Sequence, residues 1–233
     1  HLIDFVTTFK RKRTAIQIQN GDSPYIVAES TIKDWVCTLR ASLHEAEQYT
    51  GLFECCESLY GKSLKFTIDN ESDRYLTEDE LERLMGCLKK RDDLKLIQSN
   101  NNCCFSDYLT PLILTCLATG LRPMYALALK WSDIDLENNQ IKIRATKGKI
   151  KEIQWCPLKE ELLFVFNEWK KHLIHSKPGN WLFPSPNKPG CHIVSYKTAF
   201  TTFRKSYGFD FVMYDTRHTF ATNFYKATKD LKA

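Results

Sequence analysis

Three basic side chains stand at the boundaries of predicted elements, where their chemistry would be accessible. Arg122 lies in "TGLRP", between the end of one expected helix and the proline that opens the next. Lys147 lies at the tip of an expected hairpin, and Arg217 lies in the first turn of the last expected helix. An arginine in a tight turn is costly unless its charge has a partner. If these three groups converge, they form a pocket for one phosphate, with the guanidinium forks on non-bridging oxygens.

Each of these residues also has an ordinary explanation. An arginine after a helix can cap a carbonyl or pair with a carboxylate, and a lysine in a hairpin turn can simply be solvated. His218, directly after Arg217, can be a packed histidine instead of an acid–base group. The spacing alone therefore leaves the convergence of Arg122, Lys147 and Arg217 open.

The elements that must position these residues are mostly helical. "LTEDELERLM" predicts a helix start, with Thr77 as N-cap and Glu80 completing a capping box. "YLTPLILTCLATG" predicts a second helix closed by Gly120, and Pro123 then opens a short third helix. Later segments, "LKEELLFVFNEWKKHL" and "SYKTAFTTFRKSYG", have the helical period, and a final helix begins near Tyr214.

Between these helices the hydrophobic period changes from 3.6 to two. "QIKIRATKGKIKEIQWCPL" alternates apolar residues with Lys142 and Arg144, turns near Gly148 and returns. This pattern predicts a β-hairpin with one basic face and one apolar face. The apolar positions are Ile141, Ile143, Ala145, Ile150, Ile153 and Trp155. The predicted fold class is mainly α with a small antiparallel β-sheet (α+β).

Composition limits the class of protein. Hydrophobic content of 43% with 26% charged residues is ordinary for a globular chain. No apolar run approaches the roughly 20 residues of a membrane span, and the N-terminus lacks a signal-peptide core, so we expect a cytoplasmic protein. The nine cysteines are odd in number and include no C-x-x-C, which favours reduced thiols. His172 and His175 lack a third ligand at a usable spacing, so no metal site is expected.

The N-terminal part reads as a separate helical region. "ESTIKDWVCTLRASLHEAEQ" is an amphipathic helix pattern, and a polar segment follows it before the capping box. A run of four basic residues contacts DNA or ends a solvated helix: Lys10, Arg11, Lys12 and Arg13. The net charge is +5, and the positive excess lies in residues 71–233. This charge is compatible with a polyanionic partner.

Three sequence motifs, taken in their order along the chain, resemble the catalytic domain of tyrosine recombinases, the phage integrase family. They are "TGLRPMYALALKWSDID", "IRATKGKIKEIQWCPL" and "YDTRHTFAT". "WLFPSPNKPGCHIVSYKTAFTTFRKSYG" is similar to the family's segment before the third motif. The resemblance assigns residues 75–233 to that domain and residues 66–74 to a linker. Residues 1–65 resemble, in part, the family's small helical (SAM-like) core-binding domain. The resemblance implies a two-lobed clamp around duplex DNA.

The resemblance implies DNA strand transfer. A tyrosine attacks the scissile phosphate, forms a 3′-phosphotyrosine and frees a 5′-hydroxyl. Arg122 and Arg217 match the arginines that bind non-bridging oxygens, and Lys147 matches the lysine that protonates the leaving oxygen. No metal or nucleotide cofactor is implied, because the arginines supply the charge stabilisation. The expected DNA-binding residues are Lys149, Lys151 (both register alternatives to Lys147), Arg144, Lys10, Arg11, Lys12 and Arg13.

This sequence departs from the family pattern at three places. Tyr214 stands where the family usually has histidine, and a phenol can donate to a phosphate oxygen but is a poor general base at neutral pH. Tyr125 stands where the family often has an acidic residue that supports the first arginine. The nucleophilic tyrosine should follow the last helix, and Tyr225 matches only an interior helical position.

We therefore expect residues 1–233, which begin with His1 and not Met, to be an inactive fragment of a recombinase. The intact protein is expected to assemble as a homotetramer on its recombination site and to be associated with the nucleoid. Two alternatives stay open: a non-catalytic or decayed recombinase-like DNA-binding module, and a relative of type IB topoisomerases.

Overall fold

The computed structural model describes residues 29–51, 74–99, 104–144, 153–173, 177 and 179–229. The chain divides into two compact units, an N-terminal unit His1–Ser72 and a C-terminal unit Asp73–Ala233. Lys10, Arg11, Lys12 and Arg13 lie outside the described residues, as does the expected linker except for its last residue. The assignment of these two units to a core-binding and a catalytic domain stays a prediction.

The described part of the N-terminal unit is helix α3, Glu29–Thr50, where the amphipathic pattern predicts one. Val36 is buried, whereas Trp35 and Leu39, on the same predicted apolar face, are nearly half exposed. The helix ends at Gly51, which has a φ of 58° and donates its N–H to the Glu47 carbonyl at 3.0 Å. A left-handed residue of this kind stops a helix, and glycine adopts it without strain.

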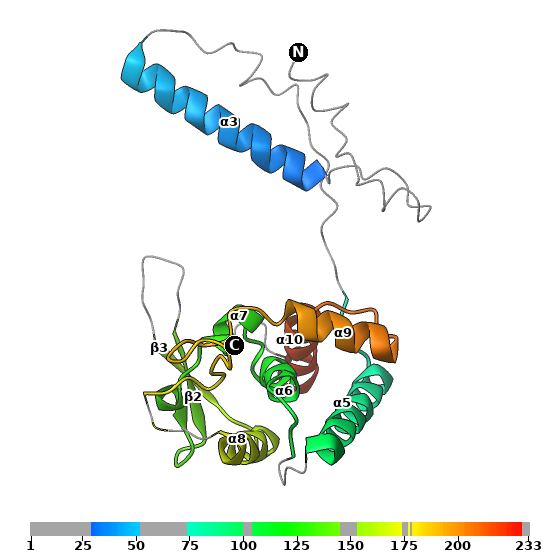
Figure 1. The fold of residues 1–233 in the computed structure, drawn as a ribbon. Helices are drawn as coiled ribbons and strands as arrows, with labels where there is room; N and C mark the ends of the chain where they lie inside the picture. Colours follow the sequence, from blue (N-terminus) through cyan, green and yellow to red (C-terminus); the bar gives the residue numbers. More distant parts are fainter. Residues whose placement is uncertain are drawn as a thin grey trace. The chain divides into compact units, whose positions relative to one another are not determined.

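The C-terminal unit is mainly helical with one small sheet, as predicted (Figure 1). None of the described helices is both long and apolar enough to cross a membrane. The elements in chain order are α5 (Glu78–Ser99), α6 (Leu109–Thr119), α7 (Pro123–Leu127), the 3₁₀ turn η1 (Trp131–Asp133), β1 (Ile134–Asp135), β2 (Gln140–Arg144), β3 (Ile153–Pro157), α8 (Glu160–His172), α9 (Lys197–Tyr207) and α10 (Asp215–Thr228).

Helix α6 is the centre of this unit, and α7, α8 and α10 pack against it (Figure 1). Its sequence is apolar on every side, and Leu109, Leu112, Ile113 and Cys116 are fully buried. A helix without a polar face is stable only inside a shell of other elements. α6 therefore lies inside the unit, and the turn with Arg122 directly follows its C-terminal end.

The capping box that starts α5 is confirmed. The N–H of Thr77 donates to Glu80 Oε2 at 3.1 Å, and the N–H of Glu80 donates to Thr77 Oγ1 at 3.3 Å. These two bonds satisfy donors that the first turn of a helix leaves without partners. The unit therefore begins with a firmly fixed residue directly after the segment that joins it to the N-terminal unit.

The three strands form an antiparallel sheet in the order β1-β2-β3. The predicted hairpin is confirmed in β2 and β3, and β1 was not predicted. The placement of Trp155 on the apolar face was wrong, because the register pairs it with Lys142 while Ile141 pairs with Cys156. Paired residues point to the same face of a sheet. Alternation fixes which residues of one strand share a face, but the loop sets the register with the next strand.

Candidate functional site

The turn after α6 is shaped by a glycine that no other residue can replace without strain. Gly120 has a φ of 64° and donates its N–H to the Cys116 carbonyl at 2.9 Å. A Cβ at this position would lie 3.0 Å from Cγ of Phe220 and closer still to Cδ1 of the same ring. Helix α10 thus approaches the turn as closely as the backbone allows, which confirms the predicted role of Gly120 as helix terminator.

Arg122 is the N-cap residue of α7, with an extended backbone and an exposed side chain. Its carbonyl accepts the N–H groups of Tyr125 and Ala126 at 2.8 and 3.0 Å. Its guanidinium carbon lies 6.0 Å from the centre of the Tyr125 ring. No ion pair joins Arg122 to a carboxylate within the described ranges. The aromatic face orients this cation without neutralising it, so its positive charge remains available to an anion.

The first turn of α10 divides "YDTRHT" between the core and the surface. Asp215 and Thr216 are buried and bind the chain just before the helix: Asp215 Oδ2 accepts the Val212 N–H, and Thr216 Oγ1 donates to the Met213 carbonyl. Arg217, by contrast, is exposed. The two buried side chains fix the start of the helix, and the helical period then places Tyr214, Arg217 and His218 outward on one face.

A second set of contacts ties this helix to the beginning of the unit. Thr219 Oγ1 accepts the N–H of Leu76 at 2.9 Å and donates to the Asp215 carbonyl at 2.7 Å. Arg74 lies between two carboxylates, 3.0 Å from Glu80 and 3.8 Å from Asp215. The residues that enter the C-terminal unit and the helix that carries Arg217 are therefore held as one block.

One hydrogen bond brings the two predicted arginines to the same turn. Arg217 Nη1 donates to the carbonyl of Gly120 at 2.6 Å, across 97 positions of sequence. Gly120 is only two residues before Arg122, so the Arg217 guanidinium is bound to the turn that carries Arg122. Tyr214 is 43% exposed, and its ring meets that of His218 edge-on at 5.1 Å between centroids. Sequence reasoning did not find this carbonyl, because a backbone acceptor has no residue signature.

The structure does not place the other predicted site residues in this arrangement. Lys147, Lys149 and Lys151 lie outside the described ranges, and Arg144 is described only as the last backbone residue of β2. Tyr225 lies on α10, is 42% exposed, and has the ammonium of Lys229 5.7 Å from its ring centre. Its position within the helix is what the sequence predicts.

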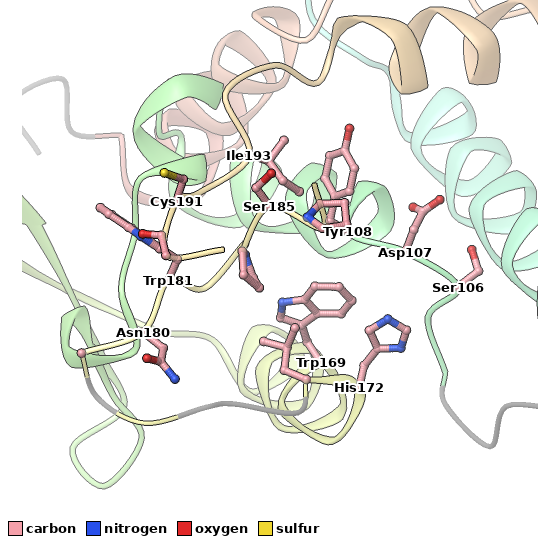
Figure 2. Close-up of a pocket in the computed structure, with 15 residues that line it drawn as sticks. Ser106, Asp107, Tyr108, Trp169, His172, Asn180, Trp181, Ser185, Cys191 and Ile193 are labelled. Atoms are coloured by element: carbon pink, nitrogen blue, oxygen red, sulfur yellow. The ribbon is translucent and has the colours of Figure 1, made fainter. Parts of the chain in front are cut away.

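Two cavities lie near these elements. One of about 280 Å³ is bordered by Leu121 and Tyr125 of the Arg122 turn and by Lys130, Lys142 and Trp181. The other, of about 610 Å³, lies at the N-terminal end of α6 (Figure 2). Trp181 borders both cavities, and none of the predicted site residues that the structure describes borders the larger one.

No cluster of three or more potential metal ligands occurs among the residues that the structure describes. His172 stacks on Trp169 with 4.8 Å between ring centres, and His175 lies outside the described residues. The cysteines in the described ranges are all free. Burial raises the pKa of the Cys116 thiol to about 12, so this sulfur is a packing group and not a nucleophile.

Comparisons with known proteins give one family and several similar folds. The model of the phage integrase family matches residues 74–233. A search of curated proteins finds no match. The Tn1549 transposon integrase (residues 82–397), solved with circular intermediate DNA, is 21% identical with a TM-score of 0.59, covering 99% of this chain and 74% of that one.

Two further solved structures are similar at the level of the fold. XerH site-specific recombinase, bound to its difH substrate in a pre-cleavage complex, is 21% identical with a TM-score of 0.59. The match covers 93% of this chain and 59% of that one. XerA recombinase is 20% identical with a TM-score of 0.50, covering 98% of this chain and 76% of that one.

Proposed function

The chain belongs to the phage integrase family, the tyrosine-type site-specific recombinases, and we propose that Arg122 and Arg217 hold the phosphate at which a DNA strand is broken. The observation that carries this proposal is the hydrogen bond from Arg217 to the Gly120 carbonyl. It anchors one arginine on the turn that presents the other. The two solved relatives above that were captured with DNA support double-stranded DNA as the substrate.

The proposed chemistry is a transesterification at phosphorus. A tyrosine hydroxyl gives its proton to water and its oxygen forms a bond to phosphorus while the bond to the 5′ oxygen breaks, and negative charge builds on the non-bridging oxygens. The guanidiniums of Arg122 and Arg217 stabilise that charge, and each such donor contributes roughly 10²–10³ in rate. Tyr214, exposed at the start of α10, donates a hydrogen bond from its hydroxyl to one of these oxygens. The leaving oxygen takes its proton from Lys147, and none of the tyrosines described above is assigned as nucleophile.

The wider organisation is part of the same proposal. Residues 1–65 form the core-binding domain, joined by the linker 66–74 to the catalytic domain, residues 75–233. Lys149, Lys151, Arg144 and the basic run from Lys10 to Arg13 bind backbone phosphates. Four copies of the intact protein assemble on the recombination site, at the nucleoid.

A second candidate function is DNA binding without catalysis. It is favoured by the chemistry of Tyr214, whose phenol stands where the family usually has an imidazole. The arginines would then bind an intact phosphodiester and the protein would regulate or compete with an active recombinase. Because both functions use the same clamp, only a covalent product separates them.

The test is to look for the covalent intermediate. The full-length gene product is incubated with labelled DNA from the ends of its own element, and adducts that resist SDS are counted. We expect an adduct from the native protein, none from Arg217→Ala, and about 10²-fold slower formation by Tyr214→Phe. Lys205→Ala, an exposed lysine on α9, is the matched control and should form the adduct at the native rate. No adduct from any version, with DNA binding intact, would establish the non-catalytic function instead.

A further inference from the structure

The smaller cavity adjoins the turn that carries Arg122. Tyr125 borders the cavity, and its ring is also the one against which the Arg122 guanidinium lies. Lys130, which directly precedes η1, and Lys142 of β2 also border the cavity. The Tyr125 ring therefore contacts both the cavity and the Arg122 guanidinium, and two further cations line the cavity.

Each of these lysines lies against an indole ring and not against a carboxylate. The ammonium of Lys130 is 4.8 Å from the centre of the Trp181 ring, and that of Lys142 is 5.7 Å from the centre of the Trp155 ring. Neither lysine forms a salt bridge within the described ranges. A cation–π contact orients an ammonium group but leaves its full charge and its N–H donors to another partner.

The ring beneath Lys130 is itself fixed. Trp181 Nε1 donates to the carbonyl of Gly190 at 2.9 Å, and the His192 ring packs edge-on against the indole at 4.9 Å. Lys130 is therefore held in place before any ligand arrives, which reduces the conformational entropy that binding would cost.

The charge around the cavity favours an anion. Among the described residues that border it, Asp133 is the one acidic residue, and its Oδ2 accepts the main-chain N–H of Lys130 at 3.0 Å. Two ammonium groups thus face one carboxylate that is already engaged with the backbone, and Arg122 adds a third positive charge nearby. Leu121, Leu129 and Ile143 supply apolar walls. A cationic pocket with apolar walls suits a phosphate that is attached to a sugar.

We propose that this cavity is a second phosphate site, in which Lys130 and Lys142 bind the DNA backbone next to the phosphate held by Arg122 and Arg217. The inference rests on the proposed function and extends it to two residues that the sequence motifs do not single out. The ligand is a phosphodiester of the same strand, one or a few nucleotides from the broken bond. The site binds without regard to base sequence, because its cations contact only the backbone.

The test is the salt dependence of DNA binding by the 1–233 chain. A short fluorescent duplex of arbitrary sequence is titrated at several NaCl concentrations. Lys130→Met and Lys142→Met each remove one phosphate contact, so each should reduce the slope of log K against log[NaCl] by about 0.9. Lys130→Arg should keep the slope. The control is Lys89→Met, an exposed lysine on α5, which lies across the unit from β2 (Figure 1) and should leave the slope unchanged.

Arg217→Ala makes the two possible failures distinguishable. A smaller slope for Arg217→Ala together with native slopes for both lysine variants would overturn the second site and leave the proposed function in place. Native slopes for all three variants, or a native chain that does not bind DNA, would overturn both. Thermal unfolding of each variant separates a lost contact from a lost fold, and since Lys130 and Lys142 lie on different elements, misfolding of one variant leaves the other as the test.

Discussion

Adding one methyl group at Gly120 should disturb both the stability of the C-terminal unit and the position of Arg217. The residue is left-handed, and a Cβ added to it would lie closer to the ring of Phe220 than carbon atoms normally approach. Its carbonyl is the acceptor for Arg217. Gly120→Ala therefore places a Cβ where the α10 ring already is, on the residue that anchors the arginine.

The magnitude follows from two independent contributions. A non-glycine residue in the left-handed region costs about 1–2 kcal/mol. The overlap with Phe220 forces the ring or the helix to move, and overpacking of this kind costs about 1–3 kcal/mol. The free energy of unfolding should therefore fall by about 2–5 kcal/mol, a large part of the stability of a domain.

Gly208 provides the matched control. It ends α9 with the same φ of 64°, but the only atom of the described residues that a Cβ there would meet is Arg83 Nη2, at an ordinary 3.6 Å. Gly208→Ala should cost the backbone contribution alone, about 1–2 kcal/mol. The difference between the two variants isolates the overlap with Phe220. In a double-mutant cycle, Phe220→Leu should recover part of the loss at Gly120, because the smaller side chain leaves room for the methyl group.

The assay is urea unfolding followed by tryptophan fluorescence, since Trp131 and Trp169 are buried in this unit and report on its packing. Duplex DNA binding, measured on the same samples, should weaken for Gly120→Ala and not for Gly208→Ala. Equal losses of stability for the two variants would refute the close approach of α10. Native DNA binding by a destabilised Gly120→Ala would refute the anchoring of Arg217 by this turn.

The remaining predictions concern the packing around the site. Burial would raise the pKa of Asp107, but hydrogen bonds from Arg91 and Lys95 outweigh it and hold this pKa below its usual value. The carboxylate therefore stabilises the fold above about pH 4, and that stability is lost as pH falls through the lowered pKa. Asp107→Asn should lower the free energy of unfolding by about 2 kcal/mol at pH 7 and flatten the acid side of a stability–pH profile. Burial raises the pKa of the Cys116 thiol to about 12, so this thiol should resist iodoacetamide at pH 8 in the native protein while the exposed cysteines react. Mass spectrometry of the labelled peptides measures this, and labelling of Cys116 at the rate of the exposed cysteines would contradict the tight packing of α6. Thr219→Val should leave a buried main-chain N–H unpaired and cost about 1–3 kcal/mol in chemical unfolding, whereas Thr202→Val on the exposed side of α9 should cost almost nothing.

The sequence predicts the starts and ends of the helices of this fold well, because each depends on residues a few positions apart. The capping box of Thr77 and Glu80, the left-handed stop at Gly120 and the start of α7 at Pro123 all lie where their residue types place them. The period-two pattern predicts the hairpin for the same reason. β1 was not predicted because two residues are too few to show a period.

Features that depend on distant contacts could not be predicted. The register that pairs Trp155 with Lys142 depends on the connection between β2 and β3, and the stacking of Lys130 on Trp181 depends on how two loops meet. The bond from Arg217 to a main-chain carbonyl leaves no trace in residue types. The family resemblance implies that the arginines share a site, which stays a prediction. The structure adds a contact that no local pattern shows: the ring of Phe220 on α10 packs against the glycine turn at the end of α6.

The contact between Leu76 and Thr219 also bears on when the packing around α6 in the C-terminal unit can form. Its two partners are 143 residues apart, and the second one belongs to the helix of Arg217. During synthesis at about 5–20 residues per second, the N–H of Leu76 waits roughly 7–30 s for its acceptor. Until α10 leaves the ribosome, the apolar end of α6 and the beginning of α5 lack the helix that packs against them. The nascent chain therefore exposes apolar surface for that interval, and the helix that covers it also carries Arg217, so Arg217 reaches the Gly120 carbonyl only when that surface is buried.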